Sequence, residues 1–169
     1  MILHEFYDDQ YPLDDEGFVT IRSTVRAIVL NDEGKLGFLH IQGEDYFGLR
    51  NHLETIGGGI EAGEDQTTAL QREVLEEIGY QCEILGSLGT IIDRYNRIHR
   101  ITVSHFYWLR ITGFKGVHRT AEEELLVQAV RWLTLEEALA YYEQPVSKVN
   151  QLVQQRDYFA LRAYQQHVQ

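Results

Sequence analysis

Residues Gly58 to Tyr80 read GGIEAGEDQTTALQREVLEEIGY, a glycine-rich turn followed by a segment with helical periodicity. Leu70, Val74 and Ile78 recur every four residues, which is the spacing of the apolar face of an amphipathic helix. Gly79 follows the last of them and is typical of the residue that ends a helix in the left-handed conformation. The stretch therefore predicts a helix that packs one side against a core.

Glu73, Glu76 and Glu77 form an acidic side on this predicted helix. At about 100° per residue they fall within an arc of about 100°, where each like-charge pair costs roughly 0.2–0.5 kcal/mol. No residue of opposite charge lies within that arc to relieve the repulsion. A bound cation would relieve it, and ligands that are all oxygen atoms favour a hard ion, Mg²⁺ first and Mn²⁺ next.

The approach to the helix favours the same kind of site. Gly57, Gly58 and Gly59 have no Cβ, so their backbone can come close to a ligand or an ion. Asp65 is a suitable N-cap, and Glu64 lies near the positive end of the helix dipole. The glycines and the glutamates together indicate a divalent cation that binds a phosphate.

The same stretch resembles the Nudix box, G-x5-E-x7-R-E-U-x-E-E-x-G-U, in which U is an aliphatic residue. The matching residues are Gly58, Glu64, Arg72, Glu73, Val74, Glu76, Glu77 and Gly79. Tyr80 departs from the aliphatic last position, and Ile56 stands where the family commonly has a proline. The resemblance covers roughly residues 22 to 142 and implies an α/β fold, an α/β/α sandwich with a mixed β-sheet.

The resemblance also implies a reaction and a set of site residues. It implies hydrolysis of the diphosphate bond of a nucleoside diphosphate linked to another moiety, such as a nucleotide, a nucleotide sugar or a dinucleoside polyphosphate. The implied metal ligands are Glu73, Glu76, Glu77 and the carbonyl of Gly57. Arg72 and Glu64 are implied to form an ion pair that orients the helix and the loop.

The base that activates water is open at this point, because members of the family differ in whether it comes from the box or from a later loop. Glu76 and Glu73 are the first candidates. The later source is the run Glu122-Glu123-Glu124, with Glu124 as its candidate, although such a run is commonly a solvated surface. Gln128 stands where some relatives have a glutamate.

Candidate substrate-binding residues lie between Asp93 and Arg100, where three arginines occur in a chain with few positive charges. Arg94 and Arg97 are candidates to bind a terminal phosphate, and Tyr95 is a candidate to stack on a base. The tyrosine also stands about where the family's dinucleoside polyphosphate hydrolases have one. The alternative is a basic hairpin tip that pairs with the acidic surface.

The rest of the chain predicts strands that alternate with helices in one domain, residues 1–169, with a helical extension at about 147–167. The predicted strands are residues 18–30, 35–42, short strands around Phe47 and Leu53, the hairpin 82–93 and 100–111, and 127–133. Thr134 and Glu137 form a capping box that opens a helix ending near Tyr142, and a last helix is expected from Ser147. That last helix has an apolar stripe that suits either the sheet or a homodimer.

Composition limits the partners. The net charge of −11 argues against a nucleic acid polymer, because phosphate neutralisation needs clustered Lys and Arg. No apolar run approaches the ~18 residues of a membrane span, and the acidic N-terminus does not resemble a signal peptide. The sequence thus predicts a cytoplasmic protein with a small nucleotide-type substrate and no membrane partner.

A non-catalytic alternative stays open, namely a Nudix-like module that binds a nucleotide to regulate a partner. The retained box carboxylates and Arg72 favour the enzyme, since a sensor can lose these residues freely.

Overall fold

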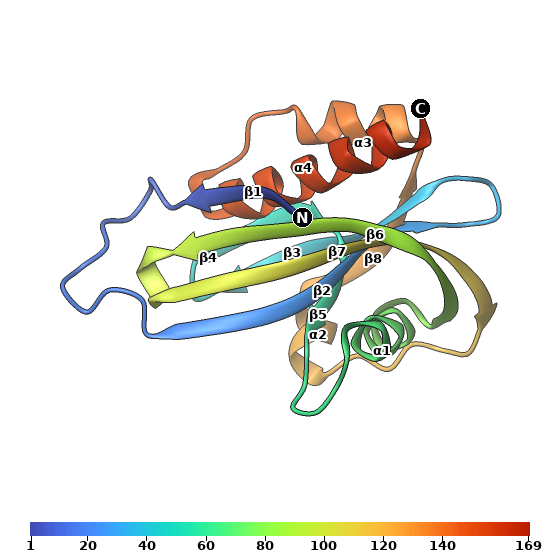
Figure 1. Cartoon of the computed structure of the whole chain (residues 1–169), viewed down its shortest axis with the longest axis horizontal. Helices are drawn as coiled ribbons and strands as arrows, with labels where there is room; N and C mark the ends of the chain where they lie inside the picture. Colours follow the sequence, from blue (N-terminus) through green and yellow to red (C-terminus); the bar gives the residue numbers. More distant parts are fainter.

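A mixed β-sheet runs through the molecule and carries helices on both faces (Figure 1). The computed structural model describes the backbone of residues 1–169 and every side chain except those of Glu122 and Leu125. In chain order the elements are β1 (Ile2–Tyr7), β2 (Thr20–Leu30), β3 (Leu36–Asp45), β4 (Gly48–Glu54), β5 (Ile56–Gly59), α1 (Gln66–Ile78), β6 (Tyr80–Tyr95), η1 (Asn96–Ile98), β7 (Arg100–Phe114), α2 (Ala121–Leu126), β8 (Val127–Leu133), α3 (Leu135–Tyr142), η2 (Lys148–Asn150) and α4 (Gln151–Val168).

The strand order is β1-β6-β7-β2-β3-β4, with β5 paired to β2 and β8 paired to β3. The pairs β1–β6 and β2–β7 are parallel, and the other pairs are antiparallel. Along β2, residues 24–27 pair with β5, and Val29 and Leu30 pair with β3. This switch of partner brings the glycine-rich strand β5 beside the middle of the sheet.

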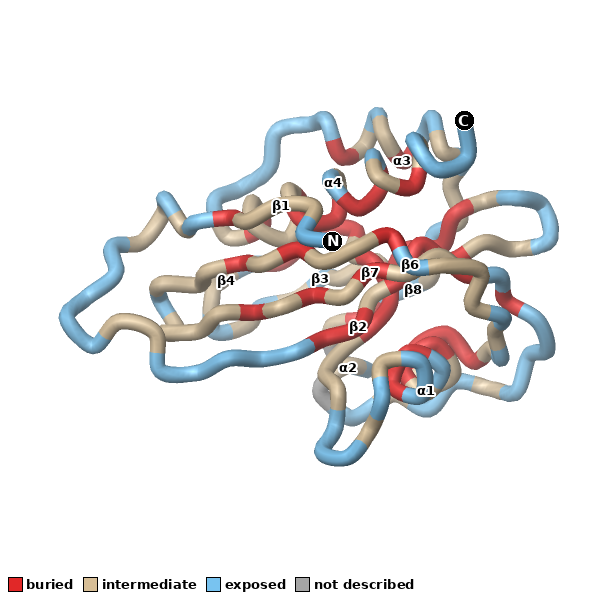
Figure 2. Tube along the Cα trace, viewed as in Figure 1, coloured by how far each residue is buried: buried red, intermediate tan, exposed pale blue. Residues whose placement is uncertain are grey.

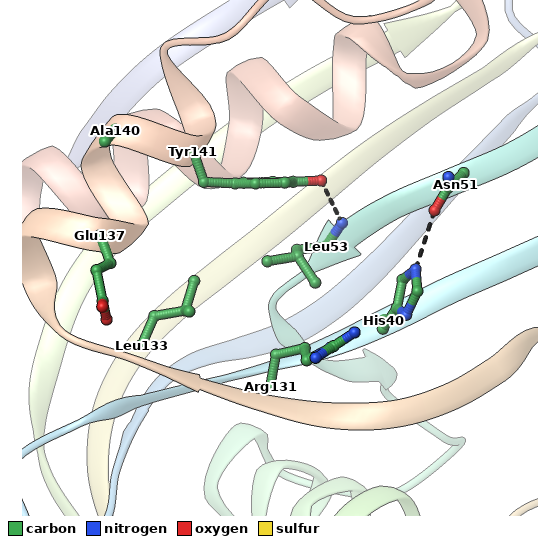
Figure 3. Close-up of a pocket in the computed structure, with 8 residues that line it drawn as sticks. All are labelled: His40, Asn51, Leu53, Arg131, Leu133, Glu137, Ala140 and Tyr141. Carbon is green, nitrogen blue, oxygen red and sulfur yellow. Dashed lines mark hydrogen bonds between the residues drawn. The ribbon is translucent and has the colours of Figure 1, made fainter.

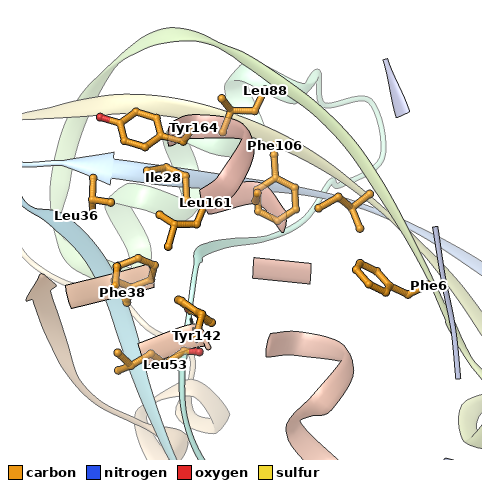
Figure 4. Close-up of a cluster of buried hydrophobic side chains, with 13 residues drawn as sticks. Phe6, Ile28, Leu36, Phe38, Leu53, Leu88, Phe106, Tyr142, Leu161 and Tyr164 are labelled. Carbon is orange, nitrogen blue, oxygen red and sulfur yellow. Dashed lines mark hydrogen bonds between the residues drawn. The ribbon is translucent and has the colours of Figure 1, made fainter. Parts of the chain in front are cut away.

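Two hydrophobic cores lie on opposite faces of the sheet, because successive residues of a strand point to opposite sides. Val25 and Val29 of β2 pack with Val74 of α1 in one core. Ile28 points to the other face and packs with Leu161 of α4 (Figure 4). Figure 2 shows the buried residues along the central strands and along the inner sides of α1 and α4.

Most of the predicted elements are confirmed. The structure contains the long hairpin of β6 and β7, with η1 at its tip, and the strand Val127–Leu133. Asp65 caps α1, Gly79 ends it with a φ of 78°, and the capping box of Thr134 and Glu137 opens α3. The mixed sheet with helices on both faces confirms the predicted α/β fold.

Other elements differ from the sequence prediction. Residues 57–59 form part of strand β5, because the antiparallel partner β2 uses their backbone groups, and glycines that the sequence places in a loop become part of the sheet. Phe47 lies in the turn between β3 and β4, and the last helix begins at Gln151, after η2. β1 and α2 were not predicted from the sequence.

Helix α4 packs on the sheet and buries polar as well as apolar side chains. Ala160, Leu161 and Tyr164 join the core, while Arg156 and Asp157 are buried beside β4. Among the residues that the structure describes, no helix combines the length and the apolar character needed to cross a membrane.

Candidate active site

Glu77 is the most buried of the three box glutamates. Its Oε2 accepts a hydrogen bond of 2.8 Å from the backbone N–H of Gly57, in the strand that α1 packs against. Burial raises the pKa of this carboxyl to about 8, and the Gly57 hydrogen bond only partly opposes that effect. A buried carboxylate with one amide donor and no direct cationic partner among the described side chains is energetically poised to bind a cation.

Glycines are required where β5 meets α1. A Cβ added to Gly58 would lie 2.6 Å from both carboxylate oxygens of Glu73, and one added to Gly57 would overlap the carbonyl oxygen of Val25. Gly57 also has a φ of 134°, which favours glycine. The backbone of β5 therefore lies directly against the Glu73 carboxylate, whose pKa is raised mainly by burial.

Arg72 holds the acidic side of α1 together. Its guanidinium donates to both oxygens of Glu64 at 2.9 Å, to Glu73 at 2.8 Å, to Glu76 at 3.1 Å and to the carbonyl of Gly59 at 2.9 Å. The predicted Arg72–Glu64 ion pair is thus present. The repulsion that the sequence predicts is therefore partly relieved without a metal ion, because the long side chain of Arg72 reaches Glu73 and Glu76 from outside their arc.

The donor set fits a hard divalent cation. Glu73, Glu76 and Glu77 supply carboxylate oxygens from one helix, and the backbone of Gly57 lies against Glu77. Oxygen donors of this kind suit Mg²⁺, which keeps several waters and substrate phosphates in its shell. The residues of the box could therefore hold such an ion between α1 and β5.

A second group of possible metal ligands lies elsewhere, where Asp14, Glu16 and His99 bring their ligand atoms within 4.8 Å of one another. The fold brings His99, which follows η1, beside the loop after β1. The two carboxylates are exposed, and His99 bonds to the carbonyl of Gly17 at 2.8 Å. Exposed acidic groups are common without an ion, so we assign no site there.

A cleft of about 420 Å³ opens beside Glu73 and Glu77. It is lined by residues of the sheet, of α1 and α2, and of α4, so it joins segments that are far apart in the sequence. The arginines that line it are Arg22, Arg26, Arg50, Arg100 and Arg156, and its aromatic residues are Phe47 and Tyr95. The cleft thus places positive charge and aromatic rings beside the box carboxylates.

One wall of the cleft is a buried ion network that includes α4. Arg26 pairs with Glu54 at 2.7 Å, and Arg156 pairs with Glu54 at 3.2 Å and with Asp157 at 2.7 Å. Asp157 also accepts from the backbone N–H of Thr55 at 2.7 Å and from its hydroxyl at 2.9 Å. Burial opposes ionisation of Glu54, but Arg26, a hydrogen bond to His52 and Arg156 outweigh it and hold the pKa of that carboxyl well below its usual range.

Asp93 of β6 lies near Arg156, Asp157 and Arg26 of this network, and its titration should make the stability of the fold depend on pH. It is fully buried, neither of its oxygens has a hydrogen-bond partner among the described residues, and burial raises its pKa to about 6. The folded protein then keeps a proton that the unfolded chain loses near its ordinary pKa of 3.8, so stability falls as pH rises from about 4 through 6.

Asp93→Asn should remove this dependence. Relative to the unmodified protein, the free energy of unfolding of the variant should increase by about 2.4 kcal/mol between pH 4 and pH 8. Urea unfolding at the two pH values measures this difference. A difference that is the same at both pH values would contradict the prediction.

The three predicted substrate residues separate in the structure. Tyr95 lines the cleft. Arg94 pairs with Glu5 at 3.0 Å and lies over the ring of Tyr7, and Arg97 lies over the rings of Tyr11 and Tyr46. Tyr95 and Arg94 point to opposite faces of β6, as neighbours in a strand must.

The acidic run at 122–124 lies on helix α2, where the sequence suggested a loop. Glu123 lines the cleft and closes the capping box with Thr120, whereas Glu124 is exposed and lies 4.0 Å from Arg119. The side chain of Glu122 lies outside the described residues. Gln128 is exposed, and its amide donates to the carbonyl of Gln42 at 3.4 Å.

A larger cavity, of about 710 Å³, lies between α3 and the sheet (Figure 3). Its lining includes Leu53, Leu133 and Tyr141, and the hydroxyl of Tyr141 accepts a hydrogen bond of 2.8 Å from the N–H of Leu53. His40 and Asn51 also line it and are joined by a hydrogen bond of 2.9 Å. It contains none of the box residues. The smaller cleft is the better candidate because it holds the buried carboxylates with raised pKa values.

Sequence reasoning missed the cleft residues Arg22, Arg26, Glu54 and Arg156. A signal existed for the first two, because residues 22, 24 and 26 alternate with the core residues of β2 and so share one polar face. No local signal pointed to Arg156, since it comes from a helix more than 70 residues after the box.

Comparisons with known proteins agree with this geometry. A family model described as NUDIX domain matches residues 20–152. No curated protein sequence matches the chain significantly.

Three solved structures share the fold. The MutT protein from Methanosarcina mazei Go1 has a TM-score of 0.65 at 14% identity, with 92% of this chain and 100% of that chain covered. The E. coli ORF135 protein has a TM-score of 0.60 at 25% identity, with 92% of this chain and 94% of that chain covered. A C. elegans Ap4A hydrolase has a TM-score of 0.61 at 14% identity, with 87% of this chain and 97% of that chain covered. Because the family model spans most of the chain and the box carboxylates meet the glycine strand at the cleft, the chain belongs to the Nudix hydrolase family.

Proposed function

We propose that this protein is a Mg²⁺-dependent hydrolase that cleaves the diphosphate bond of a nucleoside diphosphate linked to another moiety. The observation that carries the proposal is the position of Glu73 and Glu77, buried against the glycine strand beside an arginine-lined cleft. Mn²⁺ is the second choice of ion, since it accepts the same oxygen ligands.

The residues of the box take separate roles in this proposal. Glu73, Glu76 and Glu77, with the carbonyl of Gly57, hold the metal ion, which when bound neutralises charge on the phosphate oxygens and orients the attacking water. Arg72 and Glu64 keep the helix and β5 in place through their ion pair.

Water activation is assigned first to Glu76 or Glu73, with Glu124 as the candidate outside the box. Glu76 is the most accessible box carboxylate, with 40% of its side chain exposed, and among the described side chains it bonds to Arg72 alone. Glu124 is exposed on α2, so that role would require its side chain to reach the cleft.

Substrate contacts are assigned to Tyr95, Arg94 and Arg97. Tyr95 supports this best, because its ring lines the cleft and can stack on a base. Similarity to proteins described as MutT and as an Ap4A hydrolase supports a nucleotide substrate. The net charge of −11 supports a small substrate and not a nucleic acid polymer.

Chromatographic separation of the products formed with Mg²⁺ tests the function on a panel of nucleoside triphosphates, nucleotide sugars, ADP-ribose and dinucleoside polyphosphates. We expect turnover on at least one class and loss of turnover when a chelator removes the metal. Absence of turnover on every compound would refute the hydrolase. Tight binding without turnover would instead favour the nucleotide-sensing module.

A further inference from the structure

The arginines of the cleft divide into paired and unpaired residues. Those with an acidic partner within 4.0 Å are Arg26, Arg50 and Arg156, which pair with Glu54, Asp45 and Asp157. Arg22 and Arg100 have no such partner among the side chains that the structure describes. In a chain with 26 acidic and 15 basic residues, two arginines without an acid in one cleft require an explanation.

Arg22 and Arg100 come from neighbouring parallel strands, β2 and β7, where Thr20 lies opposite Arg100 and Thr102 opposite Arg22. Both line the cleft. The guanidinium of Arg22 lies over β5, because a Cβ added to Gly59 would be 3.1 Å from its Nη2. Arg22 thus lies against the last residue of β5, and Arg100 lies in the same cleft on the neighbouring strand.

One hydrogen-bond donor of the Arg100 guanidinium has no acceptor among the described residues. Its Nε is buried and has no hydrogen-bond partner among the described residues, and its guanidinium lies 5.5 Å from the centre of the Tyr95 ring. Burial lowers the pKa of Arg100, and the neighbouring charge of Arg22 lowers it further. The fold therefore keeps two like charges together at a cost in free energy.

Outside the box, the charged side chains of the cleft pair off except at Arg22, Arg100 and Glu123, which lines the cleft from α2. The cluster of Arg26, Arg156, Glu54 and Asp157 is neutral, as is the pair of Arg50 and Asp45. The box carboxylates are the ligands of the metal in the proposed function. The two guanidinium groups that remain match the charge of one further phosphate, and their fork geometry suits phosphate oxygens.

We propose that Arg22 and Arg100 bind a phosphate next to the diphosphate held at the box, so that the preferred substrates carry at least three consecutive phosphates. This inference rests on the proposed function for the place of the diphosphate. It names a nucleoside triphosphate or a dinucleoside polyphosphate as the substrate class, and it disfavours sugar-linked diphosphates.

Calorimetric titration of the full chain with inorganic tripolyphosphate and with pyrophosphate, both in Ca²⁺, tests the site without turnover. Arg22→Gln and Arg100→Gln should each weaken tripolyphosphate binding by about 10- to 100-fold, the range for a lost charge-assisted contact, and change pyrophosphate binding by less than about 3-fold. The matched control is Arg110→Gln, because Arg110 is an exposed arginine of β7, the strand that contains Arg100. It should change the binding of neither probe.

Equal losses on the two probes would overturn the proposal, because the arginines would then bind the diphosphate itself, and so would no loss on either. Arg22→Lys and Arg100→Lys keep the charge without the fork, and we expect intermediate losses on tripolyphosphate alone. These variants also serve if a glutamine variant does not fold.

Turnover separates this inference from the proposed function. The glutamine variants should raise KM for nucleoside triphosphates or dinucleoside polyphosphates and leave nucleotide sugar diphosphates unaffected. If the unmodified protein turns over no compound but the probe titrations behave as expected, the hydrolase fails and the anion site stands. If it turns over its substrate but the titrations show no loss, the anion site alone fails.

Discussion

Glu77→Gln should lower kcat/KM by at least about 10³-fold while leaving the fold intact. The glutamine has nearly the same volume, and its side-chain oxygen can still accept the hydrogen bond from Gly57. It has no negative charge, so the ion loses a buried ligand. Steady-state turnover at several Mg²⁺ concentrations, with a thermal unfolding curve for each protein, measures both effects.

The matched control is Glu83→Gln, which removes the same charge from an exposed position on β6. It should keep normal turnover. Near-normal turnover of Glu77→Gln at the Mg²⁺ concentration that half-saturates the unmodified protein would refute the assignment of Glu77 as a metal ligand. Unfolding of that variant at a much lower temperature would show a structural role instead.

Asp157→Ala should lower the free energy of unfolding by about 3–5 kcal/mol, the usual cost of breaking a buried ion pair by removing one partner. Asp157 is fully buried, and its oxygens accept from Arg156 at 2.7 Å and twice from Thr55. Among the described residues, the change leaves the buried guanidinium of Arg156 with Glu54 as its one acidic partner, and it leaves the N–H of Thr55 without its acceptor. Urea unfolding measures the loss.

The change should also reduce turnover below the level that loss of folded protein explains, because Thr55 is two residues before Gly57, whose N–H bonds to Glu77. Asp15→Ala, at an exposed loop residue, is the control and should alter neither quantity. A loss of less than about 1 kcal/mol would show that Asp157 is not a buried ion-pair partner in solution.

The box helix was predictable because its determinants are local. The apolar spacing of α1, its N-cap Asp65 and its end at Gly79 all lie within fifteen residues of one another, and the structure contains each of them. The pairing of Arg72 with Glu64 follows from the same short range. The strand β5 was not predictable, because glycines form a strand there only through their partner β2.

The substrate residues show the limit of local reasoning. Arg94, Tyr95 and Arg97 are close in sequence, yet only Tyr95 lines the cleft, because strand neighbours point to opposite faces. The cationic residues of the cleft come from β2, β4, β7 and α4. The spacing of residues within any one segment therefore does not predict that these arginines line the same cleft.

By itself the sequence determined the family, since the residues of the box lie in one short segment and the 3.6-residue repeat alone brings its three carboxylates to one side of a helix. Only the tertiary structure decided what else faces those carboxylates. Strand pairing places Arg22 beside Arg100, and packing of α4 places Arg156 and Asp157 behind the glycine strand. Those contacts depend on long-range burial and charge, which the order of residues along the chain does not display.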